Sequence, residues 1–135
     1  MQRVLSVALL LSVIGCGASE DKGYFSIGSI ALCQELDGNN QCATSTSTFA
    51  NGTSRVFATA SIKLEGKTGD FLARWSSLDG AGDLGSSTTT VSKEGTGVLS
   101  TDVYQEDGLP AGDYRLVITF DDETSKSESA DFTVE

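Results

Sequence analysis

The side chains that most often carry out catalysis are scarce in this sequence of 135 residues. It contains no His, so the commonest general base and the commonest transition-metal ligand are both missing. Serine is abundant, but no Ser-x-x-Lys dyad stands where a strand turns into a helix. No glycine-rich phosphate loop follows a strand and opens a helix. We therefore predict no catalytic residue, no metal ligand and no cofactor.

Carboxylates are the remaining candidates for chemistry, with 19 Asp and Glu against 9 Lys and Arg. A pair of carboxylates could hydrolyse a glycoside, and the acidic turns at residues 79–83 and 121–123 offer oxygen ligands suited to calcium. Neither turn has the full ligand run of an EF-hand loop, and Asp commonly serves turn geometry. We favour a solvated acidic surface. The net charge of −10 excludes nucleic acid as a partner.

The N-terminus has the pattern of an export signal. Residues 1–3 carry one positive charge, and the apolar run over residues 4–14 contains eleven residues. A helix of that length reaches roughly 16 Å, about half of a membrane's hydrocarbon core. The pattern is typical of a secretory signal peptide.

The end of this run, Val13-Ile14-Gly15-Cys16, resembles the lipobox of bacterial lipoproteins. The resemblance implies a signal peptide over residues 1–15 that is cleaved, a diacylglycerol on Cys16, and a lipidated tether over residues 16–23. It also implies a location in the cell envelope, with a lipid anchor in a bacterial membrane and the domain facing the periplasm or the surface. With Gly17 directly after the lipidated cysteine, the chain resembles lipoproteins that are sorted to the outer membrane in cells that have one. The alternative is a plain secretory signal with an accidental cysteine.

The other two cysteines, Cys33 and Cys42, enclose eight residues that include the turn formers Asp-Gly and Asn-Asn. An exported chain meets an oxidising compartment, so with Cys16 lipidated these two form an even pair. A redox site is the alternative, but Cys-x-x-Cys spacing is absent. We predict a structural disulfide.

Residues 24–135 show the alternation of apolar and polar residues that is typical of β-strands, with turn signals between the segments. No segment has a convincing helical pattern. A kink is expected at Gly28-Ser29, and a short polar edge strand at residues 86–92. The predicted segments are residues 24–33, 56–64, 71–75, 86–92, 98–105, 114–120 and 130–134. The prediction is an all-β domain, a sandwich of about seven antiparallel strands, preceded by the cleaved helical signal peptide.

Two aromatic residues are predicted for the core, Trp75 and Tyr114. Trp75 alternates with apolar residues, so burial is favoured over a role as an exposed platform for sugar stacking. The stretch Leu109-Pro110-Ala111-Gly112-Asp113-Tyr114 resembles the entry to the penultimate strand of fibronectin type III and bacterial immunoglobulin-like domains. The resemblance implies an immunoglobulin-like sandwich with a tyrosine corner, in which the Tyr114 hydroxyl bonds to nearby backbone. The cysteine pair that joins the sheets in that family is missing.

Taken together, these features predict a lipid-anchored, non-catalytic β-sandwich of the cell envelope that acts as a binding or structural module. Its expected partners are the membrane, through the lipid anchor, and an envelope protein or polymer. That partner would bind at the loops or at the strand edge of residues 88–90. One alternative is an assembly or chaperone lipoprotein of a secretion or surface apparatus. The other is a carboxylate-dependent enzyme acting on glycans.

Overall fold

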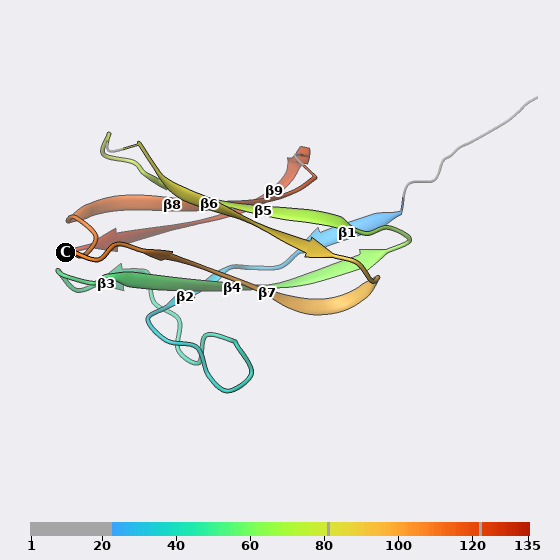
Figure 1. The fold of residues 1–135 in the computed structure, drawn as a ribbon, viewed down its shortest axis with the longest axis horizontal. Helices are drawn as coiled ribbons and strands as arrows, with labels where there is room; N and C mark the ends of the chain where they lie inside the picture. Colours follow the sequence, from blue (N-terminus) through green and yellow to red (C-terminus); the bar gives the residue numbers. More distant parts are fainter. Residues whose placement is uncertain (1–22, 81, 122) are drawn as a thin grey trace, which may run out of the picture.

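The computed structural model describes residues 23–80, 82–121 and 123–135, which form two β-sheets packed face to face (Figure 1). The signal peptide and lipidated residue predicted for the N-terminus lie outside these ranges. Within the described part, no helix is long and apolar enough to cross a membrane. The prediction of an all-β sandwich is confirmed. The strands are β1 (Tyr24–Ile27), β2 (Ala31–Cys33), β3 (Thr48–Phe49), β4 (Arg55–Glu65), β5 (Gly69–Ser77), β6 (Gly82–Val91), β7 (Gly95–Tyr104), β8 (Gly112–Phe120) and β9 (Glu123–Val134).

The first sheet is built around β4. β7 pairs with one edge of β4, and β1 and β2 pair with separate segments of β4, all of them antiparallel. β1 and β2 are the two parts of the segment predicted as one kinked strand. The interruption falls at Gly28, whose N–H donates to the Ser61 carbonyl over 2.7 Å.

The second sheet has the strand order β3-β9-β8-β5-β6. Its pairs are antiparallel, except that the two residues of β3 run parallel to the end of β9. β3 is absent from the sequence prediction, and β6, β7 and β9 begin earlier than predicted. Glycine usually marks a turn or the end of a strand, but β6 includes Gly82 and Gly85, and β7 begins at Gly95.

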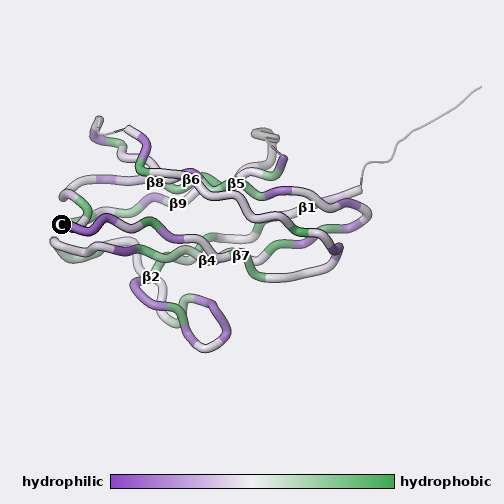
Figure 2. The backbone as a smooth tube through the Cα atoms, viewed as in Figure 1, coloured by the Kyte–Doolittle hydropathy of each residue, from purple (hydrophilic) through white to green (hydrophobic). Residues whose placement is uncertain are grey.

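The core lies between the sheets and follows directly from the two-residue period of the strands. In β4 the alternate residues that face the second sheet are buried, with exposed fractions of at most 8%: Val56, Ala58, Ala60, Ile62 and Leu64. Along the strands in Figure 2 the colour accordingly changes between hydrophobic and hydrophilic at short intervals. A slip of one residue in β4 would move this whole set to the solvent face.

Trp75 of β5 lies in the interior with 2% of its surface exposed. Its ring makes an edge contact with Phe132 of β9, with centroids 6.0 Å apart. Its indole N–H donates to the Thr101 hydroxyl of β7, on the opposite sheet, over 3.5 Å. The burial of Trp75 contradicts the alternative in which it forms an exposed platform for sugars.

Tyr114 of β8 is also 2% exposed, and its hydroxyl donates to the Pro110 carbonyl, as the tyrosine-corner resemblance implies. The ring stacks on Phe132 with a centroid distance of 5.1 Å. Burial of the phenol, followed by the nearby negative charge of Asp79, raises the pKa of Tyr114 above its ordinary value. The residue thus fixes the β7–β8 connection against the core.

We expect Trp75→Ala to lower the free energy of unfolding by about 3–5 kcal/mol, because the change empties a large site in the packed interior. Arg74→Ala, one residue away on the exposed face, should cost less than about 1 kcal/mol. Tyr114→Phe keeps the ring and loses one hydrogen bond, so its cost should lie between them at about 1–3 kcal/mol. Urea unfolding followed by tryptophan or tyrosine fluorescence measures all three. A stable Trp75→Ala protein beside an unstable Arg74→Ala protein would contradict the observed register.

Candidate interaction surface

Cys33 and Cys42 form a disulfide, with Cα atoms 5.6 Å apart, and the predicted pairing is confirmed. Cys33 ends β2, and Cys42 lies in the loop that follows. Within the loop, Asp37 organises a tight turn: its carboxylate accepts from the backbone N–H groups of Asn39 and Gln41 over 2.8 Å and 3.1 Å. The Asp-Gly and Asn-Asn sequence therefore forms the turn that its residue types indicate. We call residues 34–47 the flap.

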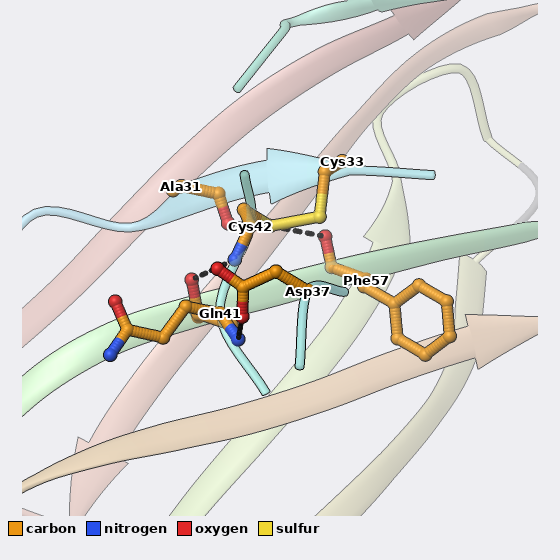
Figure 3. The surroundings of a disulfide bond; sticks show 7 residues. Ala31, Cys33, Asp37, Gln41, Cys42 and Phe57 are labelled. Carbon is orange, nitrogen blue, oxygen red and sulfur yellow. Dashed lines mark hydrogen bonds between the residues drawn. A yellow bond between two sulfur atoms is a disulfide. The ribbon is translucent and has the colours of Figure 1, made fainter. Parts of the chain in front are cut away.

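The flap lies on the outer face of the first sheet, away from the sandwich core (Figures 1 and 3). The Cys42 N–H donates to the Thr59 hydroxyl of β4 over 3.4 Å, and Cys42 Sγ lies 4.0 Å from the Phe57 carbonyl oxygen. This cover leaves Thr59 only 6% exposed, although its side chain points outward. At its far end the flap returns to β2, where the Thr46 N–H donates to the Leu32 carbonyl over 2.8 Å. The disulfide therefore fastens the flap to a sheet and does not join the two sheets.

The flap encloses a shallow groove of about 440 Å³ on this face of the molecule. In Figure 2 the flap is largely hydrophilic in colour. The groove is lined by Cys33, Gln34, Glu35, Leu36, Asp37, Ala43, Thr44 and Thr46.

A cation-aromatic cluster continues the same outer face beyond the flap. The Arg55 guanidinium lies 4.6 Å from the Tyr104 ring centroid and 5.8 Å from the Phe57 ring centroid. Its Nε also forms a salt bridge of 3.2 Å with Asp102. Tyr104 is 53% exposed, which is high for a large aromatic residue. Phe57 pairs with Cys33 across β2 and β4, so the cluster adjoins the flap. We call Arg55, Phe57, Asp102 and Tyr104 the outer-face cluster.

The sequence did not identify this cluster, although it contains a signal for it. Val56 is the first inward residue of β4, so the alternation already places Arg55 and Phe57 on the outward face. An aromatic residue on the outward face cannot pack in the core between the sheets, so Phe57 beside Arg55 already indicates an aromatic surface site. The contribution of Tyr104, however, depends on its pairing with Arg55 across β4 and β7, which the sequence pattern does not specify.

In the described part of the chain, the two acidic turns considered for calcium use carboxylates to accept hydrogen bonds from backbone N–H groups. The Asp79 carboxylate accepts from the Asp113 N–H over 2.7 Å, and the Asp121 carboxylate accepts from the Asp70 N–H over 2.9 Å. Residues 81 and 122 of these turns lie outside the described ranges. Elsewhere in the described ranges, no three Asp, Glu or Cys side chains gather as a metal site. Asp79 and Asp121 thus connect each turn to the start of a neighbouring strand, β8 and β5.

No protein-family model matches the chain, and no curated protein matches it in sequence. Solved structures resemble it in fold. An immunoglobulin-like protein from Pseudomonas aeruginosa aligns with a TM-score of 0.53 and 14% identity, covering 86% of this chain and 100% of that one. A CARDB domain from Pyrococcus furiosus, described in complex with di-metal ions, aligns with a TM-score of 0.52 and 12% identity, covering 85% and 90%.

A β-glucosidase from Listeria innocua, in complex with gluconolactone, also aligns, with a TM-score of 0.56 and 7% identity. The alignment covers 86% of this chain but only 16% of the enzyme. At such low identities the likeness shows the fold alone. The chain has an immunoglobulin-like β-sandwich fold.

We expect replacement of both Cys33 and Cys42 by Ala to lower the free energy of unfolding by roughly 2–3 kcal/mol, because the disulfide no longer restricts the unfolded chain. The sandwich should still fold, since the bond lies outside its core. Urea unfolding measures the loss. Mass spectrometry of a non-reduced digest should find the two cysteines of the unmodified protein in one linked peptide. Free thiols at both positions in protein purified without a reductant would contradict the pairing.

Proposed function

We propose that this protein is a lipid-anchored, non-catalytic module of the cell envelope that binds an envelope protein or polymer through the outer face of its first sheet. The observation that carries the proposal is the disulfide-fastened flap beside the exposed Arg55–Tyr104 stack. Stable disulfides are typical of proteins in oxidising compartments outside the cytosol. Arginine and tyrosine are enriched among the residues that dominate protein interfaces. A fixed flap and a stacked arginine are also pre-ordered, which lowers the entropic cost of binding.

The position of the proposed lipid anchor supports this use of the surface. Residues 17–23 follow Cys16 as a tether of seven residues that spans at most about 25 Å. The chain enters the sandwich at Tyr24, which pairs with Glu65 at the end of β4, whereas Arg55 stands at its beginning. β4 has 11 residues, which corresponds to roughly 35 Å. The outer-face cluster would therefore lie at the end of the domain away from the lipid.

The contacts of the acidic turns support a role without catalysis. Asp79 and Asp121 each accept a backbone hydrogen bond from the start of a neighbouring strand, a task that explains their positions without any chemistry. A function as an assembly or chaperone lipoprotein would be a narrower form of the same proposal. A partner protein that becomes unstable when this protein is absent would indicate that form.

The anchoring part of the proposal is tested at Cys16. We expect Cys16→Ser to abolish incorporation of labelled palmitate and to leave the chain uncleaved or soluble, because no thiol remains to receive the diacylglycerol. Metabolic labelling and membrane fractionation measure both outcomes. An unmodified, soluble mature form of the wild-type protein would remove the anchoring claim.

The binding part is tested with a photo-crosslinking amino acid at Ser100, an exposed position of β7 on the same face as Tyr104. We expect it to form a defined crosslinked product in intact cells. Tyr104→Ala should weaken that product by about tenfold if Tyr104 is a principal contact.

The matched control places the crosslinker at Ser129, an exposed residue of β9 in the second sheet. Strong products from Ser129, with none from Ser100, would show that the partner binds elsewhere. A Ser100 product that does not respond to Tyr104→Ala would remove the cluster from the interface.

A further inference from the structure

β6 forms an open edge of the second sheet. Among the described strands it pairs with β5 alone, and it has 10 residues. Regular pairing with β5 runs from Val91 to Gly85, where a bulge interrupts the register. Over this length the second edge of β6 presents backbone groups that another strand could bind.

The residues of this edge lack the usual protection against pairing. Residues 86–91 read Ser-Ser-Thr-Thr-Thr-Val, with no charge and no proline. Exposed edge strands normally carry lysine, proline or inward charges that prevent association. The other edge strands of the described part are short or carry a charge: β1, β2 and β3 have at most 4 residues, and β7 contains Asp102.

The strand is also held in place from its inner side. The Ser87 hydroxyl lies 2.9 Å from the Thr101 hydroxyl, which in turn accepts the Trp75 indole N–H. Thr89 and Val91 are half-buried. The edge is therefore an extended template fixed by contacts across the core, with Ser86, Thr88 and Thr90 on its outer face.

The neighbouring strand supplies charges that this edge does not carry itself. Arg74 of β5 pairs with Ser86, and Asp70 of β5 pairs with Thr90. In the described ranges Arg74 forms no ion pair, whereas Arg55 and Arg115 bind Asp102 and Asp131.

Asp70 and Asp121 likewise form no ion pair within the described ranges. They lie together through a backbone hydrogen bond and line a hollow of about 420 Å³ with Leu72 and Thr88.

We propose that β6 pairs antiparallel with β6 of a second copy of this chain, about a two-fold axis at Thr88. This symmetry places Thr90 of one copy opposite Ser86 of the other. Asp70, Thr90, Ser86 of the other copy and Arg74 of the other copy then form one row of laterally paired residues across the four strands. The two-fold symmetry produces two such rows. The strands that carry them are about 14 Å apart, and the small Thr90 and Ser86 side chains leave space for Arg74 to extend toward the carboxylate.

The charges favour a second copy of this chain as the partner that pairs with β6. In a protein of net charge −10, most contacts between copies bring carboxylates together. Pairing through β6 places uncharged residues at the contact and an unpaired arginine opposite an unpaired aspartate. The paired hydroxyl residues also suit cross-strand contact. A contact of this size is below that of a permanent dimer, so a weak dimer is expected. The inference does not depend on the lipid anchor.

A charge-swap experiment tests the register. Full-length protein purified in detergent is measured by sedimentation over micromolar to millimolar concentrations, and we expect a monomer–dimer equilibrium. Arg74→Glu places like charges in both rows, and so does Asp70→Lys, so each should weaken the dimer by about tenfold or more. Mixing the two variants restores opposite charges in both rows, and dimers should reappear. The double variant Asp70→Lys/Arg74→Glu should dimerise by itself.

Lys63→Glu is the matched control, because it also replaces a cation by a carboxylate on the exposed face of the first sheet, and its dimer should be unchanged. Thermal unfolding of every variant verifies folding; the exposed positions of Arg74 and Asp70 predict little loss. A wild-type protein that stays monomeric over the whole range overturns the proposal. So does a dimer that survives both single variants, or a mixture that fails to restore it.

Discussion

The contact between Trp75 and the opposite sheet determines much of what the surface can offer. Its ring packs on Phe132 of its own sheet, and its N–H reaches Thr101 of the first sheet, so the inward direction of Trp75 is fixed by both sheets. Because side chains alternate along a strand, burial of Trp75 forces Arg74 outward. The same Thr101 hydroxyl meets Ser87 and thereby positions β6. One buried aromatic residue thus fixes a core, an exposed charge and a strand edge together.

The disulfide serves this sandwich differently from one that joins two sheets. Buried side chains from both sheets already hold them together, such as Phe25 of β1 and Phe120 of β8, whose ring centroids are 4.7 Å apart, so a bond between the sheets would add little. The flap has no comparable core, since most of its residues are exposed. A covalent link therefore has most effect there, because it orders a polar loop that packing alone would leave with many conformations.

The sequence predicted the parts of this fold that depend on local pattern. Alternation located β4, β5 and β8, because both of their neighbours in the sheet bury the same face. It missed β3, whose two residues have no period, and the first residues of β6, whose glycines resemble a turn. The disulfide followed from cysteine count and spacing. The outer-face cluster did not, since Arg55 and Tyr104 meet only through pairing between segments far apart in the sequence.

The outer-face cluster and the β6 edge belong to different sheets, and this separation bears on how the charges are arranged. At the cluster Arg55 is neutralised within the chain by Asp102 and covers aromatic rings, so its surface is complete in one copy. At the β6 edge the cation and the carboxylates are kept apart by the strand geometry. Arg74 lies four positions after Asp70 in β5, which places them opposite different residues of β6. Two-fold symmetry inverts the order of the rows and brings them into line. A strongly acidic chain can thereby gain a favourable contact with itself at one place while its remaining surface stays repulsive.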